Sequence, residues 1–586
     1  MSSNIPSATR AAEWRSTAGG LEKNLKLNAN TNVPRSRCLP FRETLVKEAF
    51  ASVNDLDYKL AETPLGSVSL GAPAIPGRLI ITRHMACYLG ANHSQSPGQW
   101  TTTARVVLGM VLVELLYVLF IWLPYTRRLK EPASHPPPSS PADRRALFER
   151  CMGTVPNYEG YLRMWFLGAE ASEIRRDNVR EFLLWAFFDV QEGSDSGEDY
   201  SVEVDGYISY MEAGMGRLFE QGRGRAKCLR LTVDPVEPTY RTVWWYATVA
   251  LLDHATHLLL LLNGFEYFAQ PRDKVIFPPR LQHMFASRRT SAGNLSYWYR
   301  PHRSEGLPVV FFHGIGIGLW PYIDFLADVS GRKGTRQMGV IALEMLPVSF
   351  RLTEPPLGKD VFLEQFKKIL DRHMWHEFAL VSHSYGSVLS THAMQCPDLQ
   401  ARIPRAVLVD PVTILLHLPD VAYNFTRRRP TTANEWQLWY FASTDPGVAH
   451  CLGRYFFWRE NAVWADELVG RTAAPEHAGH GPKLTRQVTV CLSGLDLIVD
   501  SHAVARYLVK GGRADYPAWL QRDHGQNNAA GPDTGLVPGG DGEYYRATGS
   551  GIDILWFANH DHSQVFDSPR GRARIVAAVQ GGSEAK

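Results

Sequence analysis

The chain has few cysteines for its length, and their arrangement marks neither a disulfide framework nor a zinc site. The seven cysteines among 586 residues are spread from Cys38 to Cys491, are odd in number and include no C-x-x-C pair. This pattern argues against a small disulfide-rich secreted fold. It favours a catalytic domain in a reducing, cytosol-facing compartment.

A large excess of charge of either sign is also missing. Basic residues number 62 and acidic residues 59, which gives a net charge of +3, and the basic residues are scattered along the chain. No zinc-finger or base-stacking module is visible. We therefore expect no nucleic-acid partner.

The N-terminal region, residues 1–104, offers little from which to build a core. Its first 50 residues are polar, rich in Ser, Asn and Arg, and lack sustained hydrophobic periodicity. Glu13 and Glu22 interrupt what would otherwise resemble a mitochondrial presequence. We predict that this region is mostly disordered.

A transmembrane helix is predicted over residues 105–126. Val106–Leu123 is an 18-residue apolar run broken only by Glu114, and at 1.5 Å per residue it extends about 27 Å, close to a bilayer core of about 30 Å. Within 20 residues the N-terminal side carries only one basic residue, whereas the C-terminal side carries Arg127, Arg128, Lys130, Arg144 and Arg145. The positive-inside rule therefore predicts an integral membrane protein whose C-terminal portion is cytosolic.

A Pro-rich linker (127–139) and a helical accessory region (140–289) follow. In the accessory region Ser140, Pro141 and Asp143 form a helix start, and no chemistry is evident. A second apolar helix is expected at 243–262, against a membrane interface or the rest of the protein. Its Asp253 and His257 share one helical face, but further metal ligands are lacking, so no metal site is predicted.

The strongest chemical signal is the stretch Val381-Ser382-His383-Ser384-Tyr385-Gly386-Ser387. It follows the apolar run Phe378–Val381 and precedes a helical pattern. A strand that turns abruptly into a helix exposes the apex residue and requires small neighbours two positions away. Ser384 is therefore the candidate nucleophile, although the usual G-x-S-x-G pattern here begins with Ser382.

Three further segments carry matching chemistry, each just after a strand-like run. His313-Gly314-Ile315-Gly316 is a Gly-rich turn whose backbone, with that of Tyr385, is suited to form an oxyanion hole. Ser493-Gly494-Leu495-Asp496 supplies an acid, and Asn559-His560-Asp561-His562 supplies histidines. The order Ser, Asp, His along the chain is that of one group of catalytic triads.

These residues make the region 290–586 resemble the α/β-hydrolase superfamily in its serine-hydrolase branch. The resemblance implies the α/β fold class, with a mostly parallel sheet, helices on both faces and a lid, here 411–486, rich in aromatic residues. Residues 511–550, rich in Gly, Asp and Asn, are predicted to be a flexible loop. The expected strands are Val309–Phe312, Gly339–Leu343, Phe378–Val381, Ala406–Val409, Val488–Leu492 and Asp553–Phe557.

In this interpretation Ser384 is the nucleophile, His562 the general base and Asp496 the orienting acid, with Ile315 and Tyr385 forming the oxyanion hole. Several rival assignments stay open. Asp410 and Asp500 are alternatives for the acid, and His560 is the alternative for the base.

The sequence supports a lipase or carboxylesterase that cleaves a lipid-like acyl ester at a membrane, without cofactor or metal. One alternative is a lipid acyltransferase that uses the same serine, because His562 and Asp567 fit an H-x4-D pattern. Another is a non-catalytic scaffold with the same fold. The ordered Ser, Asp and His argue against the scaffold, since it would not need them.

Overall fold

The computed structural model describes residues 97–137, 139–155, 157–190, 199–331, 337–470, 486–509, 537–538, 545–549 and 551–581, which lie in one compact unit, Ala72–Lys586. Nearly all of the predicted disordered region 1–104 lies outside these residues. The same holds for most of the predicted flexible loop 511–550. The short pieces of that loop that are described are strands of the main sheet.

A mixed sheet organises the described chain. Its strands lie in the order β1-β3-β5-β4-β7-β8-β9-β12-β11-β10, and the six central strands run parallel. These are β5 (Val340–Leu343), β4 (Val309–Phe312), β7 (Ala379–His383), β8 (Arg405–Val409), β9 (Gln487–Ser493) and β12 (Ile552–Phe557). The outer strands are antiparallel: β1 (Glu266–Phe268), β3 (Tyr297–Arg300), β11 (Tyr545–Gly549) and β10 (Val537–Pro538).

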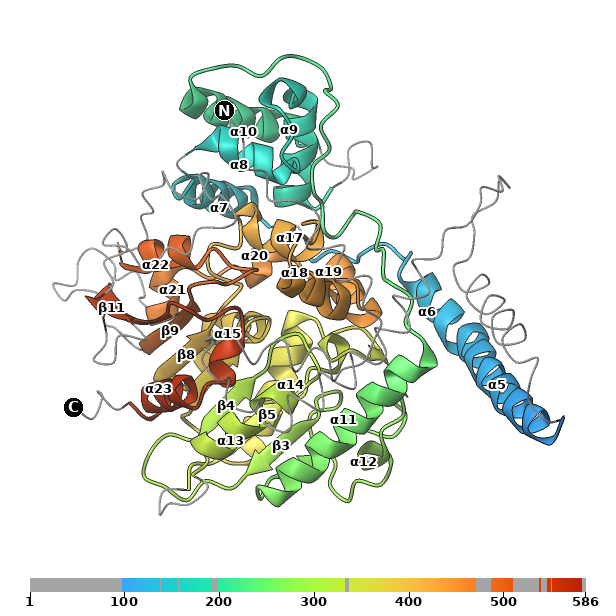
Figure 1. Ribbon diagram of the computed structural model, residues 1–586. Helices are drawn as coiled ribbons and strands as arrows, with labels where there is room; N and C mark the ends of the chain where they lie inside the picture. The colour runs from blue at the N-terminus through green and yellow to red at the C-terminus, as the bar shows by residue number, and fades with distance from the viewer. Residues whose placement is uncertain are drawn as a thin grey trace, which may run out of the picture. The chain divides into compact units, whose positions relative to one another are not determined.

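Helices cover both faces of this sheet (Figure 1). On one face Phe311 packs on Phe325 of α13 (Ile323–Val329), with ring centroids 5.4 Å apart. On the other face the next residue, Phe312, packs on Phe366 of α14 (Lys359–Arg372), also at 5.4 Å. Successive side chains of a strand point to opposite faces, so a continuous apolar run such as Val309–Phe312 requires both helical layers.

The six strands expected from the sequence are all present, with ends displaced by at most two residues. The antiparallel edge strands were not predicted. They include β1, which falls inside the predicted helical accessory region, so the sheet begins well before residue 290. A separate pair of strands, β2 (Ile276–Phe277) and β6 (Leu352–Thr353), was also missed because two-residue strands leave no periodic signal.

The accessory helices form a small aromatic core. They are α7 (Pro141–Met152), α8 (Tyr158–Trp165), α9 (Arg176–Leu183) and α10 (Ser201–Met215). As predicted, Ser140 caps α7, where its hydroxyl accepts a hydrogen bond from the Asp143 amide at 3.2 Å. The Phe148 and Tyr207 rings stack with centroids 4.0 Å apart.

The lid connects β8 to β9 and contacts the accessory helices. Its described helices are α17 (Pro419–Thr426), α18 (Ala433–Leu438), α19 (Pro446–Tyr455), α20 (Trp458–Asn461) and α21 (Ala465–Val469), with a π-helical turn at Trp439–Ser443. The Trp458 indole donates to the Ala186 carbonyl at 2.9 Å, and Thr154 bonds the His417 ring at 2.7 Å. Lid and accessory region therefore share a hydrogen-bonded boundary.

Among the residues that the structure describes, two helices are long and apolar enough to cross a membrane, by length and composition only. The first is the continuous helix of α5 (Pro97–Tyr117), a π-helical turn (Val118–Trp122) and α6 (Leu123–Arg128), which begins earlier than predicted. Within its candidate span, Thr102–Arg128, the most apolar 18-residue window has a mean hydropathy of 2.6 and is 6% buried. The second is α11 (Val243–Leu262), whose most apolar 18-residue window has a mean hydropathy of 1.3 and is 33% buried.

Candidate active site

Ser384 lies at the apex between β7 and α15 (Gly386–Gln395), with a left-handed φ of 51°. This conformation is strained for a residue with a side chain and aims the hydroxyl away from the sheet. The turn also lies close to β4. A Cβ at Gly386 would stand 2.3 Å from the Phe312 carbonyl oxygen. This clash explains why the residue two positions after Ser384 must be glycine.

The structure brings Ser384, His562 and Asp496 together from three separate segments. His562 Nε2 lies 2.8 Å from the Ser384 hydroxyl oxygen, and His562 Nδ1 lies 2.8 Å from Asp496 Oδ2. Both distances are those of hydrogen bonds, and they link the candidate nucleophile to the candidate base and the base to the candidate acid. The imidazole therefore bridges the serine and the carboxylate.

The Asp496 carboxylate is oriented by its own turn. Its Oδ1 accepts hydrogen bonds from the Ile498 amide at 2.7 Å and the Val499 amide at 2.9 Å, which leaves Oδ2 to face His562. Its side chain is fully buried. Backbone donors stabilise the negative charge there and fix the orientation of the acceptor oxygen.

Opposing effects act on the imidazole. Burial favours the neutral ring, but the charge and hydrogen bond of Asp496 outweigh it and raise the pKa of His562 to about 9. The Asp410 and Asp561 carboxylates act in the same direction. An imidazole in this position is therefore a stronger base than a solvated histidine.

The two expected oxyanion donors flank Ser384. Tyr385 is the N-terminal cap of α15, so its backbone amide precedes the helical hydrogen-bond ladder. Ile315 lines the same cavity as Ser384 and Tyr385. The loop of Ile315 lies close to the serine: a Cβ on Gly314 would stand 2.9 Å from the Ser384 Cβ.

The loop that carries Ile315 is held by residues that the sequence analysis did not single out. The Gly314 amide donates to the Tyr322 hydroxyl at 3.2 Å, and that hydroxyl lies 2.7 Å from His383 Nδ1. The Met345 amide donates to His313 Nε2 at 2.9 Å. Only the tertiary structure brings Tyr322 and Met345 to this loop, so no local signal marks them.

The rival acids have other partners. Asp500 caps the helix α22 (Ser501–Val509), where its carboxylate accepts from the Ala503 amide at 2.9 Å. Asp410 is completely buried at the end of β8. It accepts hydrogen bonds from the Ser493 amide at 2.8 Å, the Ser493 hydroxyl at 3.0 Å and the Ser563 amide at 3.1 Å. Burial and the nearby Asp496 charge raise the pKa of Asp410.

The rival base, His560, belongs to the same loop as His562 but contributes through its backbone. Its carbonyl accepts from the Leu495 amide at 2.9 Å, and its ring packs on Phe557 with centroids 5.7 Å apart. Asp561, which the sequence analysis passed over, joins the acid and histidine loops: its Oδ1 accepts from the amides of Leu497 and His562.

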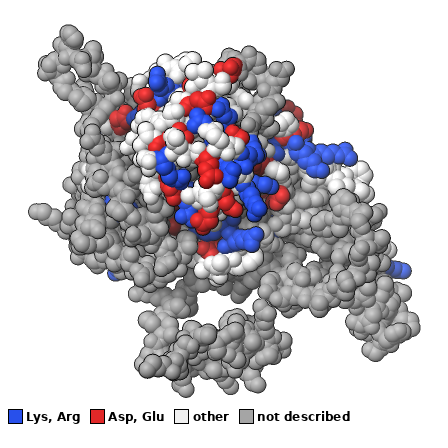
Figure 2. Space-filling view, turned by 90° about the horizontal axis from the view of Figure 1, so that it is seen from above, with Lys and Arg blue, Asp and Glu red and all other residues white. Residues whose placement is uncertain are grey.

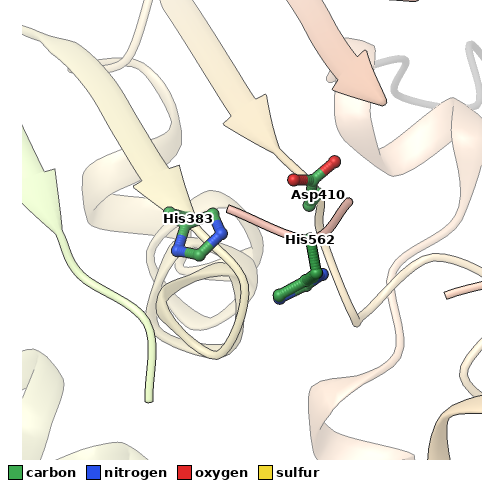
Figure 3. A group of neighbouring side chains, drawn as sticks. All are labelled: His383, Asp410 and His562. Carbon is green, nitrogen blue, oxygen red and sulfur yellow. The ribbon is translucent and has the colours of Figure 1, made fainter. Parts of the chain in front are cut away.

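His383, Asp410 and His562 are the one group of metal-ligand types in the described residues whose ligand atoms converge, all within 4.8 Å of one another (Figure 3). However, both ring nitrogens of His562 and both oxygens of Asp410 already have hydrogen-bond partners. In the other pair, Asp253 and His257, the Asp253 carboxylate already forms ion pairs with Arg280 and Arg351. The donor set therefore fits a hydrogen-bonded centre better than a metal site.

A largely apolar cavity opens beside Ser384. It is lined by the lid residues Phe425, Phe456, Phe457 and Trp458, and by Trp165 and Trp185 of the accessory region. The accessory region, where the sequence showed no chemistry, thus contributes a wall of the candidate site. The other lid aromatics pack elsewhere: Phe441 stacks on Trp245 and Trp464 stacks on His417.

A second cavity, of about 370 Å³, lies beyond Tyr385. Pro136 and Pro137 of the linker, Leu357 and Lys359 also line it, and Phe457 borders both cavities. Tyr385 and Phe457 therefore stand between the two.

Comparisons with known proteins gave short sequence matches and many structural ones. No family model matches the chain. A trans-enoyl reductase, pgmF, of Aspergillus terreus is 39% identical over 79 residues, which are 13% of this chain and 22% of the reductase. The chain thus spans about a fifth of the length of the curated relatives it matches.

Similar solved structures include a membrane phospholipase A described as a bacterial virulence factor, at 11% identity and a TM-score of 0.33, covering 58% of this chain and 94% of that one. The carboxylesterase CesB from Bacillus subtilis has 12% identity and a TM-score of 0.30, covering 57% and 99%. An esterase from Pyrobaculum calidifontis has 15% identity and a TM-score of 0.29, covering 57% and 92%.

Topology identifies the fold independently of these similarities. β4 and β5 exchange places in the sheet order, the strained serine follows the next parallel strand, and an acid and a histidine follow β9 and β12. The serine on a strand-to-helix turn, followed by Asp and then His, is the defining arrangement of one fold. The chain has the α/β-hydrolase fold, with a helical lid between β8 and β9.

Proposed function

We propose that this chain is a membrane-associated serine hydrolase that cleaves an apolar acyl ester through an acyl-enzyme. The observation that carries the proposal is the continuous hydrogen bonding from Ser384 through His562 to Asp496, at 2.8 Å in each step. A serine hydroxyl is a weak nucleophile until an adjacent base takes its proton, and this geometry places such a base in reach.

In the proposed reaction, His562 Nε2 takes the hydroxyl proton while Ser384 Oγ bonds to the ester carbonyl carbon. The carbonyl oxygen becomes an oxyanion that accepts hydrogen bonds from the Ile315 and Tyr385 amides. His562 then gives the proton to the leaving alcohol, and the acyl group stays on Ser384. A water, deprotonated by His562, attacks the acyl-enzyme and releases the carboxylic acid and the free serine.

The cavity beside Ser384 supports the proposed substrate class. Its walls are mainly aromatic and aliphatic side chains, among them Trp165, Trp185, Phe425 and Phe456. Each acyl methylene buried against such walls contributes about 0.8 kcal/mol, or about fourfold in binding. An apolar acyl chain therefore fits this site better than a polar one.

Membrane association rests on the apolar helix Thr102–Arg128, which is 6% buried in its most apolar window. Arg127 and Arg128 stand at its C-terminal end, and Arg105 is the basic residue at its N-terminal end. In this proposal the helix anchors the chain and the hydrolase fold is on the cytosolic side.

A fluorophosphonate probe tests the nucleophile directly, because it phosphonylates an activated serine. We expect labelling of the wild-type chain, none of Ser384→Ala, and wild-type labelling of the control Ser390→Ala, which changes a buried serine on the same helix. Labelling that survives Ser384→Ala would refute the serine-hydrolase proposal. If the unlabelled wild-type enzyme forms product only when an alcohol acceptor is added, the reaction is acyl transfer through the same serine.

A further inference from the structure

A carboxylate in the middle of the apolar helix is bound by the start of another helix. Glu114 Oε2 accepts a hydrogen bond from the Val243 amide at 3.2 Å, and the Tyr240 hydroxyl donates to Oε1. Val243 is the first residue of α11, where free amides and the helix dipole favour an anion. Glu114 therefore faces protein rather than the surroundings of the apolar helix.

The same face of the apolar helix stays on the protein body beyond Glu114. Tyr117 is 3% exposed, and its ring lies 5.8 Å from that of Tyr246 and 5.4 Å from that of Phe277. Further on, Trp122 meets Tyr240 at 5.1 Å. The opposite face carries Leu115, Leu116, Leu119 and Phe120, which are exposed.

This contact limits how the helix can lie in a bilayer. From Thr102, where the candidate span begins, to the contact at Glu114 the helix rises over twelve residues, a length of about 18 Å, whereas the hydrocarbon core is about 30 Å thick. The part clear of the body is too short to span the core alone. If the helix spans it, the adjoining surface of the body must lie within the bilayer as well.

We propose that the hydrolase body is partly immersed in the bilayer beside the apolar helix, with the outer faces of α11 and α12 (Leu281–Met284) in contact with lipid. This inference rests on the proposed membrane association. The lipid-contact surface consists of exposed apolar residues of α11, namely Trp244, Leu251, Leu258 and Leu262, and of Leu281, Met284 and Phe285 at α12. The α11 residues recur at helical spacing on one stripe.

The leucine and phenylalanine side chains of the lipid-contact surface are unusually exposed for apolar residues. Leu251, Leu262 and Phe285 are 63%, 73% and 76% exposed. α11 contacts both α12 and α5, so the surface is continuous with the apolar helix. Contiguous exposed apolar side chains mark interaction sites, and continuity with a membrane helix makes a bilayer the occupant.

α11 itself does not cross the bilayer in this arrangement. Asp253, in the middle of α11, pairs with Arg280 at 2.9 Å and with Arg351 at 3.0 Å, and Arg280 pairs in turn with Glu344 at 2.7 Å. Removing α11 from the body would leave these buried charges without their partners. The helix therefore lies along the body with only its outer stripe toward lipid.

Site-specific fluorescence in vesicles tests the inference on the full chain. Cys38→Ser and Cys87→Ser give a background in which the remaining five cysteines are buried. Leu258→Cys and Phe285→Cys place an environment-sensitive nitrobenzoxadiazole label on the lipid-contact surface. Lys368→Cys places it on an exposed position of α14 as the matched control.

In phosphatidylcholine vesicles we expect blue-shifted emission from the first two labels and loss of most of their fluorescence when doxyl-labelled lipid is included. The control label should change little. Flotation of the same sample separates the two hypotheses, because a chain that does not float refutes membrane association itself. A floating chain whose two labels stay unquenched refutes the immersed surface, and so does self-quenching that shows a second copy covering it.

Discussion

At the scale of single residues, the backbone and the hydrogen bonds of the site have complementary effects. Ser384, Asp410 and Ser563 all have left-handed φ values. Ser384 follows β7, Asp410 follows β8, and Ser563 is next to His562. Such conformations are costly by about 1–3 kcal/mol each and persist only where the surroundings enforce them. Here Asp410 supplies part of that enforcement, because its carboxylate holds the Ser563 amide.

The assignment of the base predicts different effects for two neighbouring histidines. His562→Ala should lower kcat by about 10³-fold or more, since triad members act as a unit. His560→Ala should leave kcat within about tenfold of wild type, because His560 serves the site through its backbone carbonyl. Steady-state hydrolysis of a chromogenic ester measures both. Inactivation by His560→Ala alone would reverse the assignment.

The pH dependence of the reaction should reflect the raised pKa of His562. Catalysis needs the neutral ring, and Asp496 raises the pKa of His562 to about 9, so activity should rise with pH and reach its plateau on the alkaline side. Asp496→Asn removes the charge that raises this pKa. The rising limb of kcat/KM should then move to lower pH, while the plateau falls. A limb that stays in place in Asp496→Asn would contradict the assigned acid.

At the scale of elements, the cavity beside Ser384 is assembled from three parts of the chain. The turn after β7 supplies Ser384 and Tyr385, α17 and the α19–α20 segment of the lid supply Phe425, Phe456 and Trp458, and the accessory region supplies Trp185. The boundary between lid and accessory region is hydrogen-bonded, as between Trp458 and Ala186. We infer that the accessory helices help to set substrate size.

Acyl-chain preference tests this role. Trp185→Ala should lower kcat/KM for a long-chain ester by about tenfold and for an acetyl ester by less than about twofold, because a long chain buries more methylenes against the apolar walls to which Trp185 belongs. Trp436→Ala is the matched control: this lid tryptophan is 52% exposed and should not change the preference. The measurement is kcat/KM across a series of p-nitrophenyl esters. Equal efficiency of the wild type on acetyl and long-chain esters would refute the apolar acyl site.

At the scale of the whole molecule, charge has no dominant sign on the coloured part of Figure 2, where acidic and basic residues are mixed with neutral ones. This agrees with the near-balance of 62 basic and 59 acidic residues. Electrostatic steering toward a highly charged partner has little basis in such a surface. The surface feature that sets one part of the molecule apart is the exposed apolar helix Thr102–Arg128.

Orientation across the membrane gives a prediction for the whole chain. In sealed microsomes a C-terminal epitope tag should be removed by added protease, and the sequon at Asn294 should carry no glycan, because the positive-inside rule places both in the cytosol. The sequon at Asn424 is a poorer reporter, since its side-chain amide donates to the Ile498 carbonyl at 3.0 Å. A protected tag, or a glycan on Asn294, would establish the opposite orientation.

Several features could be predicted from the sequence because their causes are local. The runs Val309–Phe312 and Ala406–Val409 are apolar at every position, as only strands buried on both faces are, and they match β4 and all but the first residue of β8. Ser384 was recognisable because the turn that strains it demands small residues at fixed spacing. The positions after strands favoured Asp496 and His562 but left Asp410, Asp500 and His560 open as rivals, and the structure places Asp496 and His562 within hydrogen-bond distance of each other.

Other features depended on contacts between distant segments and left no local pattern. Trp165 and Trp185 face the Ser384 cavity only because the accessory helices pack on the lid. β1 joins the sheet through three pairs with β3, which is too short a segment for periodicity to mark. Glu114, which the sequence presents as an isolated charge in an apolar run, gains its partners from residues more than 120 positions away. The sequence by itself therefore determined the six central parallel strands, the serine turn and the order of the candidate triad, since backbone strain and local burial act over a few residues. The walls of the cavity and the partner of Glu114 were decided by the tertiary structure, because packing and hydrogen bonding join segments irrespective of their distance along the chain.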